Sequence, residues 1–175
     1  MAALVVYFSR QGANSRYGDS RDLEVGSTQL LAEALAARVG APLFRIEPAE
    51  SYSRECDATV ERNALEQAGA SAPELAGALP GLTGVDRVFM GSPVWDDHLP
   101  VIVRTFLAAA GGLAGKTIHP FLTYGIGPGF VFDDYRELCP DATVSEGLAV
   151  PSAEVGSDAA DAAVEGWIER LGRTQ

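Results

Sequence analysis

Residues that bind metals or form disulfide bonds are scarce in this 175-residue sequence, which contains two cysteines and two histidines. Cys56 and Cys139 form no CxxC pair, and His98 and His119 form no metal-ligand cluster, so we predict no metal site. His119 lies inside an apolar run, which favours a buried residue with satisfied hydrogen bonds. So few thiols also exclude a disulfide-stabilised scaffold, and the pattern gives no support for a Cys56–Cys139 bond.

The sequence also lacks a signal peptide and any apolar run long enough to span a bilayer, which predicts a soluble, cytoplasmic protein. Basic residues are few: 13 Lys and Arg stand against 24 Asp and Glu, for a net charge of −11. Because there is no basic patch, we expect neither nucleic acid nor a membrane as a partner. The excess of acidic residues either serves solubility alone or attracts a basic protein or a cationic substrate.

Three apolar runs each end in a loop that suits ligand binding. Residues 4–8 lead into a loop that begins with Ser9, residues 87–90 lead into a loop that ends in Trp95, and residues 116–122 lead into the glycine-rich segment 123–129. Ligands bind outside the carboxyl ends of the strands in open α/β sheets, so these loops predict a site with a polar end and a flat, aromatic end. The alternative for Trp95 is simple packing in the core.

Hydroxyl groups also precede the first periodic, helix-like segment. Gly26, Ser27 and Thr28 stand directly before residues 30–36. The first N–H groups of a helix have no intrahelical partner, and the helix dipole favours negative charge there, so Ser9, Ser27 and Thr28 are candidates for binding a phosphate. The alternative is that Ser27 or Thr28 simply caps its own helix.

Alternating strand and helix patterns continue to the end of the chain. We predict further strands at 42–46, 86–90, 116–122 and 143–148, and helices at 53–67, 99–110, 130–138 and 157–171. Strands separated by helices of this size form right-handed crossovers in a parallel sheet that is covered on both faces. We therefore expect one α/β domain over residues 1–175, a three-layer sandwich with five parallel strands.

Residues 11–25, after the first strand, do not fit this alternation. The segment is polar, contains glycine and has no hydrophobic period, so we predict an inserted loop without a place in the core. Either Arg10, Arg16 or Arg21 folds over a phosphate or a substrate, or the segment is a mobile excursion on the surface.

The chain resembles the flavodoxin-like family, specifically its short-chain branch with an extended phosphate-binding loop. The matching pieces follow the order of the strands: residues 5–9 with 26–29, residues 44–48 with Tyr52, residues 91–95, residues 99–100 with 105–107, and residues 115–123. The resemblance covers nearly the whole chain and implies that the five parallel strands are arranged in the order 2-1-3-4-5. No single piece is diagnostic, but the ordered set is fairly specific.

This resemblance implies a non-covalently bound FMN. Its phosphate would be held by residues around the first strand end and the first helix start: Ser9, Arg10, Ser27, Thr28 and Gln29. Its ring would lie between two loops, against Pro93, Val94 and Trp95 on one side and Thr123, Tyr124, Gly125 and Gly127 on the other. The protein would be an electron carrier that docks a redox partner protein, or a small NAD(P)H:quinone-type reductase with an aromatic, quinone-like substrate. It would be a monomer or a homodimer.

Four residues depart from the family pattern and support a second hypothesis. Asp96 and Asp97 stand where a second tryptophan commonly follows the first, and Ile126 and Pro128 change the glycine-rich turn. In this hypothesis the protein keeps the fold but has lost FMN, and its cleft serves small-molecule binding or acid–base catalysis. The proton donors would then be His98, which follows two carboxylates, and Tyr124.

Overall fold

A computed structural model of the chain describes residues 1–16 and 19–173. The central parallel sheet contains β4 (Leu43–Arg45), β1 (Ala2–Tyr7), β5 (Val85–Pro93) and β6 (Thr117–Tyr124) side by side in that order. Two short strands, β7 (Thr143–Val144) and β8 (Leu148–Pro151), both pair with β6 at the far edge. This is the strand order 2-1-3-4-5 that the sequence predicts.

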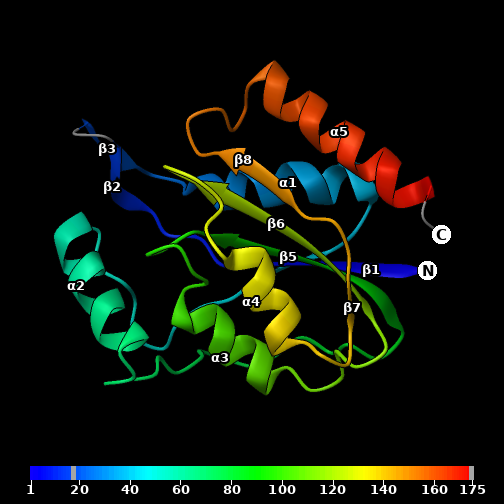
Figure 1. Cartoon of the computed structure of the whole chain (residues 1–175), viewed down its shortest axis with the longest axis horizontal. Helices are drawn as coiled ribbons and strands as arrows, with labels where there is room; N and C mark the ends of the chain where they lie inside the picture. The colour runs from blue at the N-terminus through cyan, green and yellow to red at the C-terminus, as the bar shows by residue number, and fades with distance from the viewer. Residues whose placement is uncertain (17–18, 174–175) are drawn as a thin grey trace.

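Helices cover both faces of the sheet (Figure 1). α1 (Ser27–Val39) and α5 (Asp158–Arg173) lie on one face, and α3 (Val101–Ala109) and α4 (Val131–Leu138) lie on the other. Alternate residues of the strands serve the two layers: Val6 and Met90 pack towards α3 and α4, whereas Val5 and Phe89 pack towards α1 and α5. Within the described residues, no helix combines the length and apolar character needed to cross a bilayer.

The last predicted strand, 143–148, is divided in the structure. β7 ends at Val144 and β8 begins at Leu148, and two of the residues between them, Glu146 and Gly147, make contacts outside the sheet. The indole N–H of Trp167 donates to the carbonyl oxygen of Glu146 at 2.9 Å. A Cβ on Gly147 would lie 2.1 Å from the ring of Phe132, so a larger residue there would require this ring to move.

The segment 11–25 is inserted after β1, and its described residues add no strand to the central sheet, but it is not the irregular loop that we predict. β2 (Gly12–Arg16) and β3 (Asp19–Leu23) form an antiparallel hairpin, which satisfies backbone groups without needing a hydrophobic period. The hairpin stands beside α2 (Cys56–Gln67), at the same end of the sheet (Figure 1). The N–H of Ala13 donates to the carbonyl oxygen of Arg54 at 2.7 Å, and Arg54 pairs with Asp22 at 3.0 Å. The side chain of Arg16 lies outside the described part of the chain.

Candidate functional site

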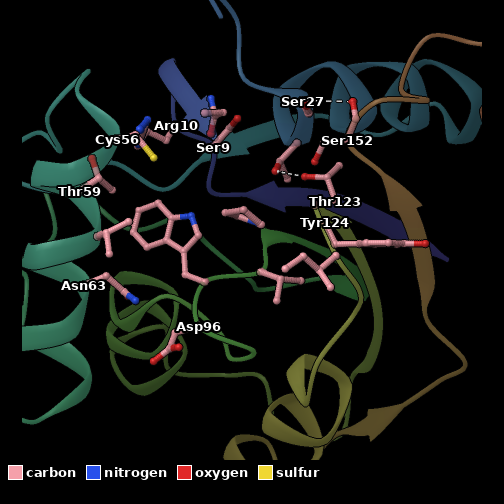
Figure 2. A pocket seen from close by; sticks show the side chains of 18 of the residues that line it. Ser9, Arg10, Ser27, Cys56, Thr59, Asn63, Asp96, Thr123, Tyr124 and Ser152 are labelled. Atoms are coloured by element: carbon pink, nitrogen blue, oxygen red, sulfur yellow. Dashed lines mark hydrogen bonds between the residues drawn. The ribbon is translucent and has the colours of Figure 1, made fainter. Parts of the chain in front are cut away.

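A cavity of about 670 Å³ lies at the carboxyl edge of the sheet. Its walls come from the ends of β1, β5 and β6, the start of α1, the segment after β8, the hairpin and one face of α2 (Figure 2). Most of the predicted site residues line it: Ser9, Arg10, Ser27, Thr28, Pro93, Val94, Trp95, Thr123, Tyr124, Gly125 and Gly127. The fold therefore brings together three loops that are distant in sequence.

One end of the cavity is rich in hydroxyl groups. The hydroxyls of Thr28 and Thr123 lie 2.8 Å apart in the buried floor, and the hydroxyl of Ser27 donates to the carbonyl oxygen of Ser152 at 3.5 Å. The Oγ of Ser9 accepts a hydrogen bond from the backbone N–H of Gln29 at 3.1 Å. Ser9 thus caps α1 from another element, since Gly26, the N-cap residue, has no side chain to do so.

Close packing at this end depends on Gly26. A Cβ there would lie 2.2 Å from the Oγ of Ser9 and 2.4 Å from the carbonyl oxygen of Arg10, distances that real contacts do not reach. The absence of a side chain lets the start of α1 approach the end of β1. The first N–H groups of the helix and several hydroxyls then face one small volume, which is the donor set that an anion such as a phosphate needs.

Gln29 does not line the cavity with its side chain. Its amide nitrogen donates to Glu33 at 2.8 Å, and its amide oxygen accepts from Arg45 at 2.9 Å. The backbone N–H of Gln29 is the group that contributes to the hydroxyl-rich end. The prediction that Gln29 helps to hold a phosphate therefore concerns its backbone and not its side chain.

Arg10 lines the cavity between the hydroxyl-rich end and α2. Its guanidinium donates to the carbonyl oxygen of Ala13 at 2.9 Å, which ties it to the hairpin. Burial lowers the pKa of Arg10, and the nearby Cys56 thiol acts in the opposite direction. Figure 2 shows these two side chains next to each other.

The aromatic end is built around Trp95. Edge-to-face contacts hold its indole, with ring centroids 5.4 Å from Phe8 and 4.9 Å from Tyr52. Tyr52 is itself fixed, because its hydroxyl donates to the buried carboxylate of Glu66 at 2.8 Å. Burial and this carboxylate raise the pKa of Tyr52. The indole is thus a pre-positioned wall of the cavity rather than a mobile surface group.

The two aspartates after Trp95 serve a tight turn. Trp95 and His98 exchange two backbone hydrogen bonds of 3.1 Å, and Asp96 and Asp97 between them both have positive φ, +52° and +62°. Positive φ at both central residues is the pattern of a type I′ turn, which aspartate tolerates better than tryptophan does. The carbonyl oxygen of Asp97 accepts from the N–H of Phe130 at 2.7 Å, which joins this turn to the loop after β6.

His98 lies outside the cavity lining and faces α4. Its Nδ1 is 3.0 Å from a carboxylate oxygen of Asp134, and its ring stacks on Phe130 at 5.4 Å. The carboxylate beside His98 is therefore Asp134, not Asp96 or Asp97. Tyr124 does line the cavity, so the structure does not bring His98 and Tyr124 together as an acid–base pair.

The changes in the glycine-rich loop do not fill the cavity. Ile126 is 83% exposed, so its side chain extends mainly into solvent at the rim. The cavity remains open with these residues in place.

Sequence reasoning missed the wall that α2 contributes. Cys56, Thr59, Val60 and Asn63 line the cavity, and their spacing of i, i+3, i+4 and i+7 places them on one helix face. That spacing was available in the sequence, but a mostly polar stripe is usually assigned to solvent. Ser152 was also missed, although it directly follows the last strand at the same edge.

Strand order and the position of the cavity place the protein among the doubly wound α/β proteins. A family model described as Flavodoxin matches residues 23–171, which is most of the chain. The chain belongs to the flavodoxin family. A search of curated proteins gave no match.

Several solved structures are similar over nearly the full length. A candidate flavoprotein from Bacteroides eggerthii is 26% identical, covers 98% of each chain and has a TM-score of 0.74. A second, from Bacteroides uniformis, is also 26% identical, covers 96% of this chain and 97% of its own, and has a TM-score of 0.73. A Lactobacillus acidophilus flavoprotein solved in complex with FMN is 18% identical over 89% of this chain and 96% of its own, with a TM-score of 0.66. This last likeness shows the fold alone.

Proposed function

We propose that the cavity binds FMN non-covalently and that the protein is an FMN-dependent oxidoreductase. The observation that carries the proposal is the meeting of two ends in one cavity: hydroxyls and helix N–H groups around Thr28, and the fixed indole of Trp95. Membership of the flavodoxin family and the FMN complex of a protein with the same fold support it.

The donor set fits FMN in its chemistry. Ser9, Ser27 and Thr28, with the free N–H groups of α1, would hold the phosphate, and Arg10 would add a positive charge. Trp95 and Tyr124 would flank the flat ring. When bound, FMN supplies the electron-transfer chemistry, while the chain's own residues bind and orient it and exclude water.

A reductase of small molecules is favoured over an electron carrier. The cavity continues past Trp95 to the hairpin and α2, so its lining includes residues beyond those needed for a phosphate and one ring, such as Leu23 and Val60. A carrier needs mainly an exposed ring edge and a docking face, whereas a reductase needs room for a second planar molecule. Solubility alone is enough to account for the acidic net charge, so this charge does not require a protein partner.

Titration of the desalted protein with FMN, followed by flavin fluorescence and the visible spectrum, tests this proposal. We expect saturable quenching with a Kd in the micromolar range or below. Riboflavin, which lacks the phosphate, is the matched control ligand and is expected to bind at least about tenfold more weakly, because it loses charge-assisted hydrogen bonds. Absence of FMN binding would overturn the proposal, and equal affinity for riboflavin would remove the phosphate site from it.

A further inference from the structure

Two of the loops around the cavity are joined at both of their ends. The loop after β5 carries Trp95 and the loop after β6 begins at Tyr124, and these two residues would flank the flavin ring. Where the loops leave the sheet, the N–H of Val94 donates to the carbonyl oxygen of Thr123 at 3.2 Å. The paired strands fix this end, so the spacing between the two walls depends on what joins the loops at their other end.

At the other end, the loop after β6 packs directly on the turn that follows Trp95. The N–H of Phe130 donates to the carbonyl oxygen of Asp97 at 2.7 Å, and Gly129 has a φ of +52°. A Cβ on Gly129 would lie 2.2 Å from the same carbonyl oxygen, so the two backbones are in contact.

The carboxylate of Asp134, in the first turn of α4, holds the turn after Trp95. One oxygen accepts a hydrogen bond from the backbone N–H of Leu99 at 2.8 Å, and the other lies 3.0 Å from Nδ1 of His98. The guanidinium of Arg104, on α3, lies 3.7 Å from the carboxylate and balances its charge. Only 13% of the Asp134 side chain is exposed, so this carboxylate is a fixed anchor and not a solvated surface group.

The backbone of Asp134 is attached to the other loop. Phe130, at the end of that loop, is the N-cap residue of α4, and its carbonyl oxygen accepts the N–H of Asp134 at 2.9 Å. The ring of Phe130 also stacks on His98, with centroids 5.4 Å apart. Asp134 therefore joins the end of one loop through its backbone to the end of the other through its side chain.

We infer that Asp134 is a positioning residue of the flavin site, which sets the spacing between the walls formed by Trp95 and Tyr124. This inference rests on the proposed FMN-dependent function. Asp134 lies outside the cavity lining, so it acts on the ring through the two loops. Spacing matters because a gap of about 0.5–1 Å forfeits a quarter to a half of the energy of an atomic contact. His98 then serves as a partner of this carboxylate and not as an acid–base group in the cavity.

Titration of the desalted protein with FMN and with riboflavin tests the inference, because the two ligands share the ring and differ in the phosphate. We expect Asp134→Ala to weaken both ligands by the same factor, about tenfold. Asp134→Asn keeps an acceptor for Leu99 and should stay within about threefold of the wild type. By contrast, Thr28→Val should weaken FMN alone. Asp133→Ala is the matched control: it removes a carboxylate from the same helical turn, but that side chain is 73% exposed and pairs with Arg136.

A second measurement needs no bound flavin. The chain has two tryptophans, so in a Trp167→Phe background the fluorescence comes from Trp95 alone. We expect Asp134→Ala to lower the fluorescence anisotropy of Trp95, because an indole released from its turn moves on the nanosecond timescale. Asp134→Asn and Asp133→Ala should keep the anisotropy of this background.

The outcomes separate this inference from the proposed function. Unchanged riboflavin affinity in Asp134→Ala, or an equal loss in Asp133→Ala, would overturn the positioning role while leaving FMN binding intact. If neither flavin binds the wild type, the proposed function fails; lower anisotropy in Asp134→Ala would still assign the positioning of Trp95 to Asp134, and unchanged anisotropy would overturn it. Urea unfolding checks that each variant is folded. If Asp134→Ala does not fold, His98→Leu removes one partner of the carboxylate and should weaken both flavins by an equal factor; unchanged affinities would then overturn the inference.

Discussion

The hydroxyl oxygens of Thr28 and Thr123 lie 2.8 Å apart, although 95 positions separate the two residues in the sequence. Thr28 lies in the first turn of α1 and Thr123 lies near the end of β6, so this hydrogen bond joins two of the elements that form the cavity. Both residues are 2% exposed, and the pair forms part of the buried floor where a phosphate would bind.

Thr28→Val removes a hydroxyl from this floor at nearly constant volume. We expect it to weaken FMN binding by at least about tenfold, since a hydrogen bond to a charged group contributes roughly 1.5–3 kcal/mol. The Kd from flavin fluorescence is the measurement. Thr105→Val is the control, because the Thr105 hydroxyl bonds the carbonyl oxygen of Val101 within α3, away from the cavity. Equal FMN affinity in wild type and Thr28→Val would contradict the phosphate assignment.

Gly26→Ala tests the close packing of α1 on β1. The added Cβ would meet the backbone oxygen of Arg10 at 2.4 Å, so the start of the helix must move. We expect a loss of about 1–3 kcal/mol in the free energy of unfolding, as for overpacking elsewhere, together with weaker FMN binding. Urea unfolding of the FMN-free protein gives the first quantity. Gly111→Ala is the matched control, since its Cβ would have no atom within 4 Å, and stability losses of equal size would contradict the steric argument.

Trp95→Leu removes the aromatic wall. We expect a changed visible flavin spectrum and weaker FMN binding. A pair of aromatic rings in contact is stabilised by about 1 kcal/mol beyond the effect of the area it buries, and the flavin would lose this contact. Trp95→Phe is expected to lie between wild type and Trp95→Leu. Trp167→Phe is the control: this second tryptophan is buried against Phe89, away from the cavity. A spectrum that Trp95→Leu leaves unchanged would remove Trp95 from the ring site.

The sheet and most of the site followed from the sequence, because both depend on local patterns. Apolar runs, helix periods and a small number of turn residues were enough to predict a parallel sheet and the three loops at its carboxyl edge, and the resemblance to the flavodoxin-like family implied the strand order. The hairpin was not predicted, because two polar strands that bury little apolar surface have no hydrophobic period. Its position depends on contacts with Arg54, and no local pattern encodes them.

Long-range partners account for the other differences. Asp134, which contacts His98, lies 36 positions further along the chain. The sequence shows only the adjacent Asp96 and Asp97, so these were predicted as the carboxylates beside His98. The polar stripe on α2 that ends in Asn63 looked like a solvated face. It becomes a cavity wall only because the hairpin and Trp95 stand opposite it.

His119 predicts a pH dependence of stability. It is 3% exposed; its Nε2 accepts from Arg87 at 3.2 Å, so Nδ1 carries the proton and donates to Ser145 at 2.7 Å. Burial and the positive charge of Arg87 lower the pKa of His119 to about 4. The unfolded chain takes up this proton near pH 6.5, whereas the folded protein resists protonation until about pH 4. Stability from this residue is therefore complete above pH 6.5 and is lost as the pH falls towards 4.

Urea unfolding at pH 7.5 and pH 5.0 measures this contribution. Linkage gives a loss of about 2 kcal/mol for the wild type over that interval from His119 alone. His119→Gln keeps an acceptor for Arg87 and a donor for Ser145 but cannot be protonated, so its stability should fall by about 2 kcal/mol less than that of the wild type. His98→Gln removes the other histidine and should leave the His119 contribution in place. The same pH dependence in His119→Gln and the wild type would contradict this prediction. His119 would then bind a proton as readily in the folded protein as in the unfolded chain, and the buried imidazole would not be neutral at pH 5.0.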